Sequence, residues 1–476
     1  MRRLALIAVL AACGDNLEPT ETETEPTPIE ATCSEAEVPQ LLAKLPNVSQ
    51  VVSGQCGDFV VGAKCFEVMI NQPVDHKNPS GPTFKQQLFV MHRGCDRPTV
   101  IADWGYSWEY FYDDELATLF GANAIWVEHR FQGESVPIGV DWDWKQLTIE
   151  NGAGDLHRVV ESFKHLWGAN WVSTGASKGG ITATYHSYFY PDDLNGTVPY
   201  VAPASRSRLD VAYQYYLDSV MTTPCAQRVR DSQVAALTSR RAMMIARIDA
   251  NVGVGAGEIY IDLMTAHLDW AFWQYYGVDY CTRVPGPTAT DDQFWNFFAE
   301  MSGFSGAATG EEMSDGALVY EWMTEQGFAL QIGEHVRPLL KSEYALATME
   351  DNFRAQFPEV PLPTFDGSVT RAARRWAELY ADNVLLIYGQ YDPWSGGALA
   401  VPKQPTSARY FVPEATHGGA AIAGLVLADR TAALEHAARM FGVAPMLQNM
   451  QRAIEATKRR DAILSRIEQR HVMRLP

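Results

Sequence analysis

Apolar and polar positions follow two different patterns along this 476-residue chain. Between residues 33 and 205, apolar runs of strand length alternate with segments of helical periodicity. The runs are "KQQLFVMHR" (85–93), "PTVIADWG" (98–105), "NAIWVEHR" (123–130), "NWVSTG" (170–175) and "GTVPYVAP" (196–203), and the helical segment is "DLHRVVESFKHLWG" (155–168). Because strands that alternate with helices form mainly parallel sheets, this region predicts an α/β fold with helices on both faces of the sheet.

Residues 206–380 carry a helical pattern instead, with apolar spacing of about 3.6 residues and many aromatic side chains. The helical segments are "LDVAYQYYLDSVM" (209–221), "HLDWAFWQYYG" (267–277), "DDQFWNFFAEM" (291–301) and "GALVYEWMTEQGFALQIG" (316–333). Strand patterns return at "NVLLIYGQ" (383–390) and "ARYFV" (408–412), and the chain closes with helices. We therefore expect a helical cap over 206–380, inserted between two parts of one α/β core, 33–205 and 381–476. The basic stretch "KRRDAILSRIEQRH" (458–471) is expected to be a solvated helix face.

The N-terminus has the pattern of a targeting segment. Arg2 and Arg3 precede the apolar run "LALIAVLAA" (4–12), which is too short to span a bilayer. The sequence Leu-Ala-Ala-Cys that ends at Cys13 resembles a bacterial lipobox, and this implies that residues 1–13 direct lipidation of Cys13. An ordinary signal peptide with a chance cysteine is the alternative. Residues 14–32 are acidic and rich in Pro and Thr, which predicts a flexible tether. We expect an extracytoplasmic lipoprotein at the outer membrane or cell surface, or a secreted protein.

Net charge and cysteines narrow the class of protein further. The formal net charge of −19 at pH 7 argues against a nucleic-acid-binding protein. Six cysteines follow Cys13, and an even number in an exported protein favours disulfides, with free buried thiols as the alternative. The favoured pairs are Cys56–Cys65, Cys225–Cys281 and, as the remainder, Cys33–Cys95. The sequence has no CxxC or HExxH spacing, so it does not predict a zinc site.

Candidate chemistry centres on Ser177. The sequence from Gly175 to Gly179 is Gly-Ala-Ser-Lys-Gly, and it lies between an apolar, strand-like run and a helical one. A G-x-S-x-G motif in this setting is typical of a nucleophile elbow. A serine alcohol needs a histidine base and an acid that orients the base, and in this fold the chain order is Ser, Asp or Glu, then His.

The next two predicted strands supply both partners. Asp392 follows "NVLLIYGQ" and His417 follows "ARYFV". Because catalytic groups collect at the carboxyl ends of parallel strands, the sequence predicts the triad Ser177, Asp392 and His417. His129 also follows a strand, but it precedes Ser177 and so breaks the expected order. The oxyanion hole needs two backbone N–H donors, for which Lys178 and Tyr106 are predicted. A degenerate hydrolase without activity is the alternative.

Four segments resemble the bacterial prolyl tri- and tetrapeptidyl aminopeptidases, which are related to the prolyl carboxypeptidase and dipeptidyl peptidase group. They are "QPVDHKNPSGPTFKQQL" (72–88), "EHRFQGES" (128–135), "GASKGGITATYHSYFYPDDLNGTVPYVAP" (175–203) and "YGQYDPWSGG" (388–397). The resemblance covers roughly residues 33–430 and is weakest in the helical cap. It implies an α/β-hydrolase fold, a cap over the active site, the same three catalytic residues, and release of short N-terminal peptides that end in proline.

An exopeptidase of this kind must also bind the free ammonium group of its substrate. Glu128, at the end of a predicted strand, is the predicted partner, with an internal salt bridge to Arg130 as the alternative. Trp394 and aromatic residues of the cap are predicted to form the proline pocket. The function predicted is therefore a lipid-anchored serine peptidase that acts on peptides with a free N-terminus and needs no metal or organic cofactor. The alternatives are an esterase of the same fold and an inactive peptide-binding surface lipoprotein.

Overall fold

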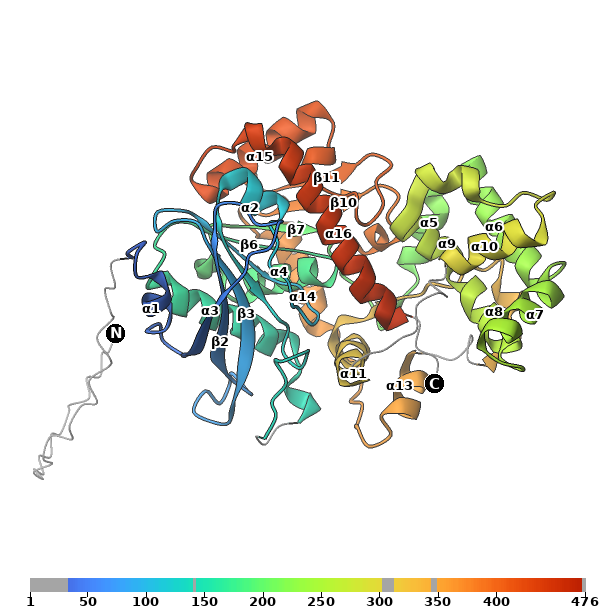
Figure 1. Cartoon of the computed structure of the whole chain (residues 1–476), viewed down its shortest axis with the longest axis horizontal. Helices are drawn as coiled ribbons and strands as arrows, with labels where there is room; N and C mark the ends of the chain where they lie inside the picture. Colours follow the sequence, from blue (N-terminus) through green and yellow to red (C-terminus); the bar gives the residue numbers. More distant parts are fainter. Residues whose placement is uncertain (1–32, 140–142, 302–311, 344–348, 473–476) are drawn as a thin grey trace, which may run out of the picture.

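The computed structural model of this chain describes residues 33–139, 143–301, 312–343 and 349–472 (Figure 1). The predicted targeting segment and tether, residues 1–13 and 14–32, lie outside these ranges. Among the helices of the described residues, none combines the length and the apolar character that a membrane span requires.

A sheet of nine strands forms the centre of the described structure, in the order β1-β2-β3-β5-β4-β6-β7-β10-β11. Three strands at one side are antiparallel: β1 (Val48–Gly54), β2 (Lys64–Pro73) and β3 (Thr83–His92). The other six run parallel: β4 (Thr99–Asp103), β5 (Asn123–Val127), β6 (Trp171–Ala176), β7 (Gly196–Tyr200), β10 (Leu385–Gly389) and β11 (Ala408–Val412). The predicted mostly parallel α/β sheet is thus confirmed.

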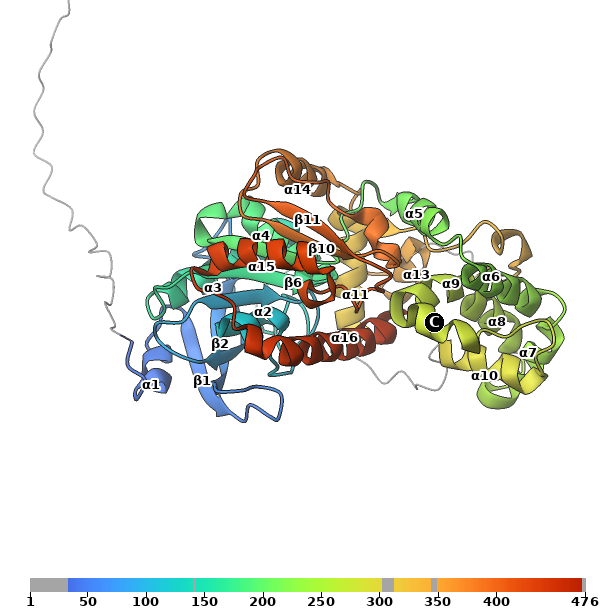
Figure 2. The ribbon, with the colours of Figure 1, turned by 90° about the horizontal axis from the view of Figure 1, so that it is seen from above.

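Helices cover both faces of the sheet, which explains why the parallel strands appear in the sequence as apolar runs. One face carries α3 (Ile149–Lys164), α4 (Lys178–Phe189) and α14 (Ser368–Leu379), and the other carries α2 (Glu115–Phe120), α15 (Leu427–Phe441) and α16 (Met450–Val472). In β4, Ile101 joins the core on the α3 side, whereas Val100 and Ala102 join the core on the α2 side. Helix α16 runs from beside α2 toward the helical lobe (Figures 1 and 2).

A second lobe of helices stands beside the sheet (Figure 1). It comprises α5 (Ala212–Val220), α6 (Pro224–Leu237), α7 (Arg241–Val252), α8 (Gly257–Ala266), α9 (Leu268–Ala271) and α10 (Asp291–Met301), and it has a hydrophobic core of its own. Helices α11 (Glu312–Glu321) and α13 (Met349–Gln356) lie between this lobe and the sheet (Figures 1 and 2). Helix α14, which follows them, packs against α4 with buried Ala373 and Ala377.

The helix predicted over 316–333 is shorter in the structure. Helix α11 continues as a π-helical turn, Trp322–Gln326, and then ends at Gly327. Gly327 has a φ of 74°, and a Cβ atom there would overlap with the carbonyl oxygen of Ser207. The chain next forms β9 (Phe328–Ala329), which pairs with β8 (Leu209–Asp210). The prediction was wrong here because Gly327 adopts a positive φ that ends the helix, although the apolar spacing continues beyond it.

The three predicted disulfides are confirmed. Cys33–Cys95 joins the segment before α1 (Val38–Leu42) to the loop after β3, Cys56–Cys65 closes the loop between β1 and β2, and Cys225–Cys281 lies within the helical lobe.

Candidate active site

Ser177 lies on the sharp turn between β6 and α4. Its backbone has a φ of 57° and a ψ of −127°, a conformation that residues other than glycine rarely adopt. The neighbouring glycines are needed for close packing. A Cβ atom on Gly175 would overlap with the carbonyl oxygen of Gly179, and one on Gly179 would lie 2.9 Å from Cα of Trp104. These features define a nucleophile elbow.

Asp392 and His417 form a buried pair. His417 Nδ1 lies 2.8 Å from Asp392 Oδ2, and Asp392 is 0 % exposed. Asp392 Oδ1 accepts the backbone N–H of Trp394 at 3.0 Å, so both carboxylate oxygens are held. A carboxylate that accepts the Nδ1 proton leaves Nε2 as the proton-accepting nitrogen of the neutral ring, which is the tautomer that a general base requires.

The elbow and the Asp392–His417 pair lie at the same edge of the sheet. The N–H of Ser177 donates to the carbonyl of Tyr200 at the end of β7, and β7 pairs with β10, which precedes Asp392. The N–H of Tyr391 donates to the carbonyl of Ala415 at 2.9 Å, which joins the loops that carry Asp392 and His417. His417 also lines a small cavity together with Ala176, the residue before the predicted nucleophile.

Two other parts of the chain hold the His417 loop. The N–H of His417 donates to the carbonyl of Gln274 in the π-helical turn Phe272–Tyr276 of the helical lobe. From α16, Arg460 donates to the carbonyls of Gly418 and Ala420 at 3.4 and 3.3 Å. Arg460 is 3 % exposed, so the prediction of a solvated face for 458–471 is wrong at this residue. The buried guanidinium donates hydrogen bonds to these two loop carbonyls, and buried carbonyls need such partners.

The two predicted oxyanion donors lie on adjoining loops. Lys178 is the first residue of α4, so its N–H has no carbonyl one turn back to pair with. The side chain of Lys178 donates from Nζ to the carbonyl of Gly105 at 2.9 Å, and Gly105 directly precedes Tyr106. The loop after β4 is therefore fastened to the elbow, and the roles of Lys178 and Tyr106 as N–H donors stay predictions.

Lys178 also begins a buried network of charges. Its Nζ lies 2.7 Å from Glu321 Oε2, the same oxygen lies 3.1 Å from His129 Nε2, and His129 Nδ1 lies 2.7 Å from Asp103 Oδ2. Burial alone would lower the pKa of His129, but the charges of Asp103 and Glu321 outweigh it and raise that pKa to about 9. Burial alone would raise the pKa of Glu321, but Lys178 and His129 outweigh it and lower that pKa to about 2.

The network ties α11 to the elbow, and the sequence did not predict it. Asp103 ends a predicted strand, a position that could have drawn attention to it. Glu321 gave no such signal, since it lies inside a helical segment far along the chain from the elbow.

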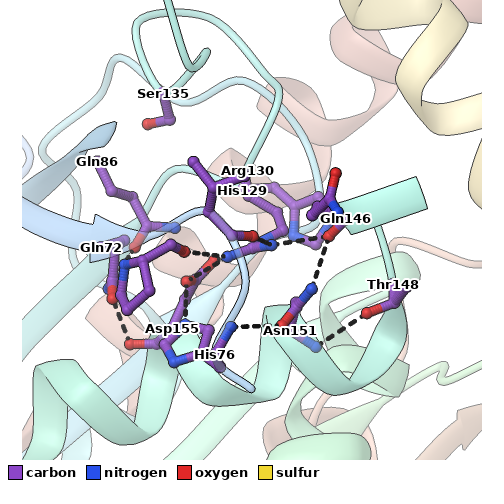
Figure 3. A network of polar contacts seen from close by, with 12 residues as sticks. Gln72, His76, Gln86, His129, Arg130, Ser135, Gln146, Thr148, Asn151 and Asp155 are labelled. Carbon is purple, nitrogen blue, oxygen red and sulfur yellow. Dashed lines mark hydrogen bonds and ion pairs between the residues drawn. The ribbon is translucent and has the colours of Figure 1, made fainter. Parts of the chain in front are cut away.

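The loop after β5, which carries Glu128, His129 and Arg130, is anchored to α3 (Figure 3). Arg130 forms a double contact with Asp155, at 2.7 Å from Nε and 2.9 Å from Nη2, and His76 Nε2 lies 2.7 Å from Asp155 Oδ1. Both partners of the pair are fully buried, and their geometry is the bidentate one that makes such pairs strong. The Glu128–Arg130 salt bridge that the sequence left open does not form, because Arg130 pairs with Asp155.

Glu128 is 2 % exposed, and its carboxylate is held by its own loop region. Oε1 accepts the N–H of Trp108 at 3.1 Å, and Oε2 accepts both the N–H and the hydroxyl of Ser135 at 2.9 and 2.7 Å. Burial raises the pKa of Glu128 to about 7. These contacts give Glu128 a structural role, and its predicted role in binding a substrate ammonium stays a prediction.

Trp394 lies among aromatic rings of the helical lobe and beside the His417 ring. Its ring centroid is 6.3 Å from that of His417 and 5.3 to 5.7 Å from those of Trp270, Phe328 and Tyr213. We name Tyr213, Trp270, Phe328 and Trp394 the aromatic cluster. An apolar wall next to the base is the setting expected of a proline pocket, and this role of Trp394 stays a prediction.

One group in the described residues has the spacing of a metal site: Glu35, His92 and Cys95. Cys95 is bonded to Cys33, so its sulfur cannot act as a thiolate ligand. His92 Nε2 instead contacts Glu35 Oε2 at 2.9 Å.

The parallel strands, their helical layers and the serine elbow at the carboxyl end of β6 define an α/β hydrolase. This chain belongs to the PS-10 peptidase S37 family, whose family model matches residues 39–476. It is therefore a serine hydrolase of a peptidase family.

One relative with a similar sequence agrees with this family. The chain is 30 % identical over 451 residues to a prolyl tri/tetrapeptidyl aminopeptidase of Streptomyces mobaraensis, covering 92 % of each chain. Among solved structures, it is similar to a proline iminopeptidase of Mycobacterium smegmatis, with 13 % identity, a TM-score of 0.32, and coverage of 83 % of this chain and 99 % of the other. A feruloyl esterase B of Aspergillus oryzae gives 14 % identity, a TM-score of 0.36, and coverage of 86 % and 91 %. The fold assignment rests on the sheet and the elbow, and not on these two likenesses.

Proposed function

We propose that this peptidase removes tripeptides and tetrapeptides that end in proline from the free N-terminus of peptide substrates. Ser177 Oγ attacks the carbonyl carbon of the proline residue, while His417 Nε2 accepts the serine proton. Asp392 holds the Nδ1 proton and stabilises the imidazolium that forms. His417 then protonates the leaving amine, and water releases the peptide from the acyl-enzyme with His417 again as base.

The observation that carries this proposal is the 2.8 Å contact between His417 Nδ1 and Asp392 Oδ2, at the strand ends next to the Ser177 elbow. The N–H groups of Lys178 and Tyr106 are the proposed donors to the oxyanion. Trp394 with its aromatic neighbours offers the apolar surface for the proline ring. The relative from Streptomyces mobaraensis supports the choice of substrate, because that protein is a prolyl tri/tetrapeptidyl aminopeptidase.

The proposal is tested by initial rates on Ala-Ala-Pro-p-nitroanilide with a free and with an acetylated N-terminus. A Ser177→Ala variant serves as the blank. The expected result is cleavage that prefers the free amine and that disappears in the variant. Equal cleavage of both forms would contradict the aminopeptidase assignment, and the absence of Ser177-dependent cleavage would direct attention to acyl esters. If Ser177 also failed to react with a fluorophosphonate, the inactive peptide-binding alternative would hold.

We propose further that Cys13 is lipidated and that the mature protein is anchored outside the cytoplasm. The lipobox pattern supports lipidation, and the three disulfides support an oxidising compartment. Mass spectrometry of the N-terminal peptide is expected to find acyl groups on Cys13, and a Cys13→Ser variant is expected to leave the membrane fraction. An unmodified Cys13 in membrane-associated protein would contradict the anchor.

A further inference from the structure

Asp269, in α9 of the helical lobe, has an oxygen that the rest of the described structure leaves unused. Asp269 Oδ1 accepts the N–H of Trp270 at 2.9 Å and lies 3.4 Å from the amide nitrogen of Gln233. Asp269 Oδ2 is buried and has no hydrogen-bond partner within the described ranges. In the part of the chain that the structure describes, no other carboxylate oxygen is both buried and without a hydrogen-bond partner. The residue is 2 % exposed.

Among the described residues, no lysine or arginine forms an ion pair with the carboxylate of Asp269. Other buried carboxylates are compensated by cations: Glu321 by Lys178 and His129, and Asp155 by Arg130. The arginine whose charge acts on Asp269 is Arg230, and its guanidinium forms an ion pair with Asp218 at 2.9 Å. Burial raises the pKa of Asp269 to about 6. A buried carboxylate charge without a paired cation destabilises the folded protein, and a bound cation would remove this cost.

One further unpartnered polar atom belongs to the aromatic cluster. Trp394 Nε1 is buried without a hydrogen-bond partner among the described residues. The ring of Trp394 lies 5.3 Å from that of Trp270 between centroids. The carboxylate of Asp269 is an acceptor that suits an ammonium group, and the indole N–H of Trp394 is a donor that suits a peptide carbonyl.

The distance to the catalytic pair fits a short peptide. The ring centroid of His417 lies 6.3 Å from that of Trp394, and the Trp394 centroid lies 5.3 Å from that of Trp270, next to Asp269. The two separations place Trp270 within about 12 Å of His417, a span that three or four extended residues cover at roughly 3.3 to 3.6 Å each.

We propose that Asp269 binds the α-ammonium group of the peptide substrate. The peptide then lies along the aromatic cluster, with its proline carbonyl at Ser177 and the indole N–H of Trp394 donating to a carbonyl of the peptide. The spacing between Asp269 and Ser177 thereby sets the number of residues released. This inference rests on the proposed function, which supplies substrates with a free N-terminus.

The test compares Asp269→Asn with the wild type on the free and the acetylated Ala-Ala-Pro-p-nitroanilide. Asparagine keeps the shape and one acceptor but removes the charge. We expect kcat/KM for the free-amine substrate to fall about 30-fold or more, with the acetylated substrate nearly unchanged, because the lost term is the ammonium contact. The matched control is Glu300→Gln, which removes a partly exposed carboxylate of α10 that pairs with Arg283, and it is expected to keep both rates.

Binding provides a second readout that needs no catalysis. In the Ser177→Ala background, calorimetry with the tripeptide Ala-Ala-Pro should show an affinity at least about 30-fold weaker when Asp269→Asn is added, and thermal unfolding should confirm that the variant is folded. A folded Asp269→Asn enzyme that keeps the wild-type preference for the free amine would overturn the role of Asp269 and leave the proposed function intact. A wild-type enzyme without preference for the free amine would overturn both.

Discussion

Two histidine–aspartate pairs lie at the same edge of the sheet, and they differ in what surrounds the histidine ring. His129 Nδ1 lies 2.7 Å from Asp103 and His417 Nδ1 lies 2.8 Å from Asp392. All four side chains are buried, and each aspartate stands at or just beyond the end of a parallel strand. The geometry of the pair by itself therefore does not identify the catalytic histidine.

The second ring nitrogen separates the two pairs. His129 Nε2 contacts Glu321, so the ring lies between two carboxylates and its pKa is raised to about 9. A histidine that stays protonated at neutral pH cannot accept the proton of a serine. His417 faces one aspartate and lines the cavity beside the elbow. One carboxylate orients a base, whereas a second carboxylate converts the histidine into a structural cation.

The largest expected effect is a difference in kcat between variants of the two histidines. His417→Ala should lower kcat by about 10⁴- to 10⁶-fold, because the proton acceptor is lost. His129→Gln should keep the kcat of its folded fraction within about 10-fold, because no proton acceptor of the reaction is removed. Initial rates, normalised by active-site titration with a fluorophosphonate, separate the two cases. A folded His129→Gln enzyme as inactive as His417→Ala would remove the distinction between the pairs.

The charges around His129 can be tested through stability. Lys178→Met or Glu321→Gln should each lower the free energy of unfolding by about 3 to 5 kcal/mol, because either change leaves a buried charge without its partner. The double variant should lose clearly less than the two single losses combined, and this coupling is measured by urea unfolding of the four proteins. Strict additivity would show that Lys178 and Glu321 do not act as a pair.

The pH dependence of stability provides a finer test of the same network. The folded-state pKa of His129, about 9, exceeds its ordinary value near 6.5. Its contribution to stability is therefore fully present below about pH 6.5 and is lost as the pH rises to 9, by about 3 kcal/mol at most. Glu128 and Glu325, whose pKa values burial raises to about 7, change their contribution mostly below this window. Between pH 7 and 9, His129→Gln should show a flatter loss of stability than the wild type, and parallel curves would contradict the assignment.

The site residues that the sequence predicted lie next to a recognisable strand pattern. The residues that it missed are defined by contacts between segments far apart in the sequence. Ser177, Asp392 and His417 each follow a short apolar run that forms a parallel strand, so the pattern of one strand and its loop was enough to predict each of them. Glu321 lies on α11 and Asp269 on α9 of the helical lobe, and their partners are brought close by helix packing. Such packing has no fixed spacing in the sequence, so neither residue could be predicted from the pattern.

The elements of the fold also divide into those that the sequence pattern predicted and those that it missed. The parallel strands were predicted because helices cover both their faces, which makes them apolar throughout. The antiparallel strands β1 and β2 were not among the predicted runs. In β1 most positions are exposed or half-buried, so the strand lacks an apolar run. The helix predicted over 316–333 ends at Gly327, whose positive φ ends the helix although the apolar spacing continues beyond it.

The smallest effect is expected for Glu128→Gln, and it sharpens the contrast between the two candidates for the ammonium site. Glu128 accepts three hydrogen bonds from Trp108 and Ser135, and glutamine would turn an NH₂ group toward donors of that set. The variant should lose about 1 to 3 kcal/mol of stability. Its preference for free over acetylated Ala-Ala-Pro-p-nitroanilide should match that of the wild type. If Glu128→Gln lost this preference and Asp269→Asn kept it, the ammonium site would lie at the end of β5 and not in the helical lobe.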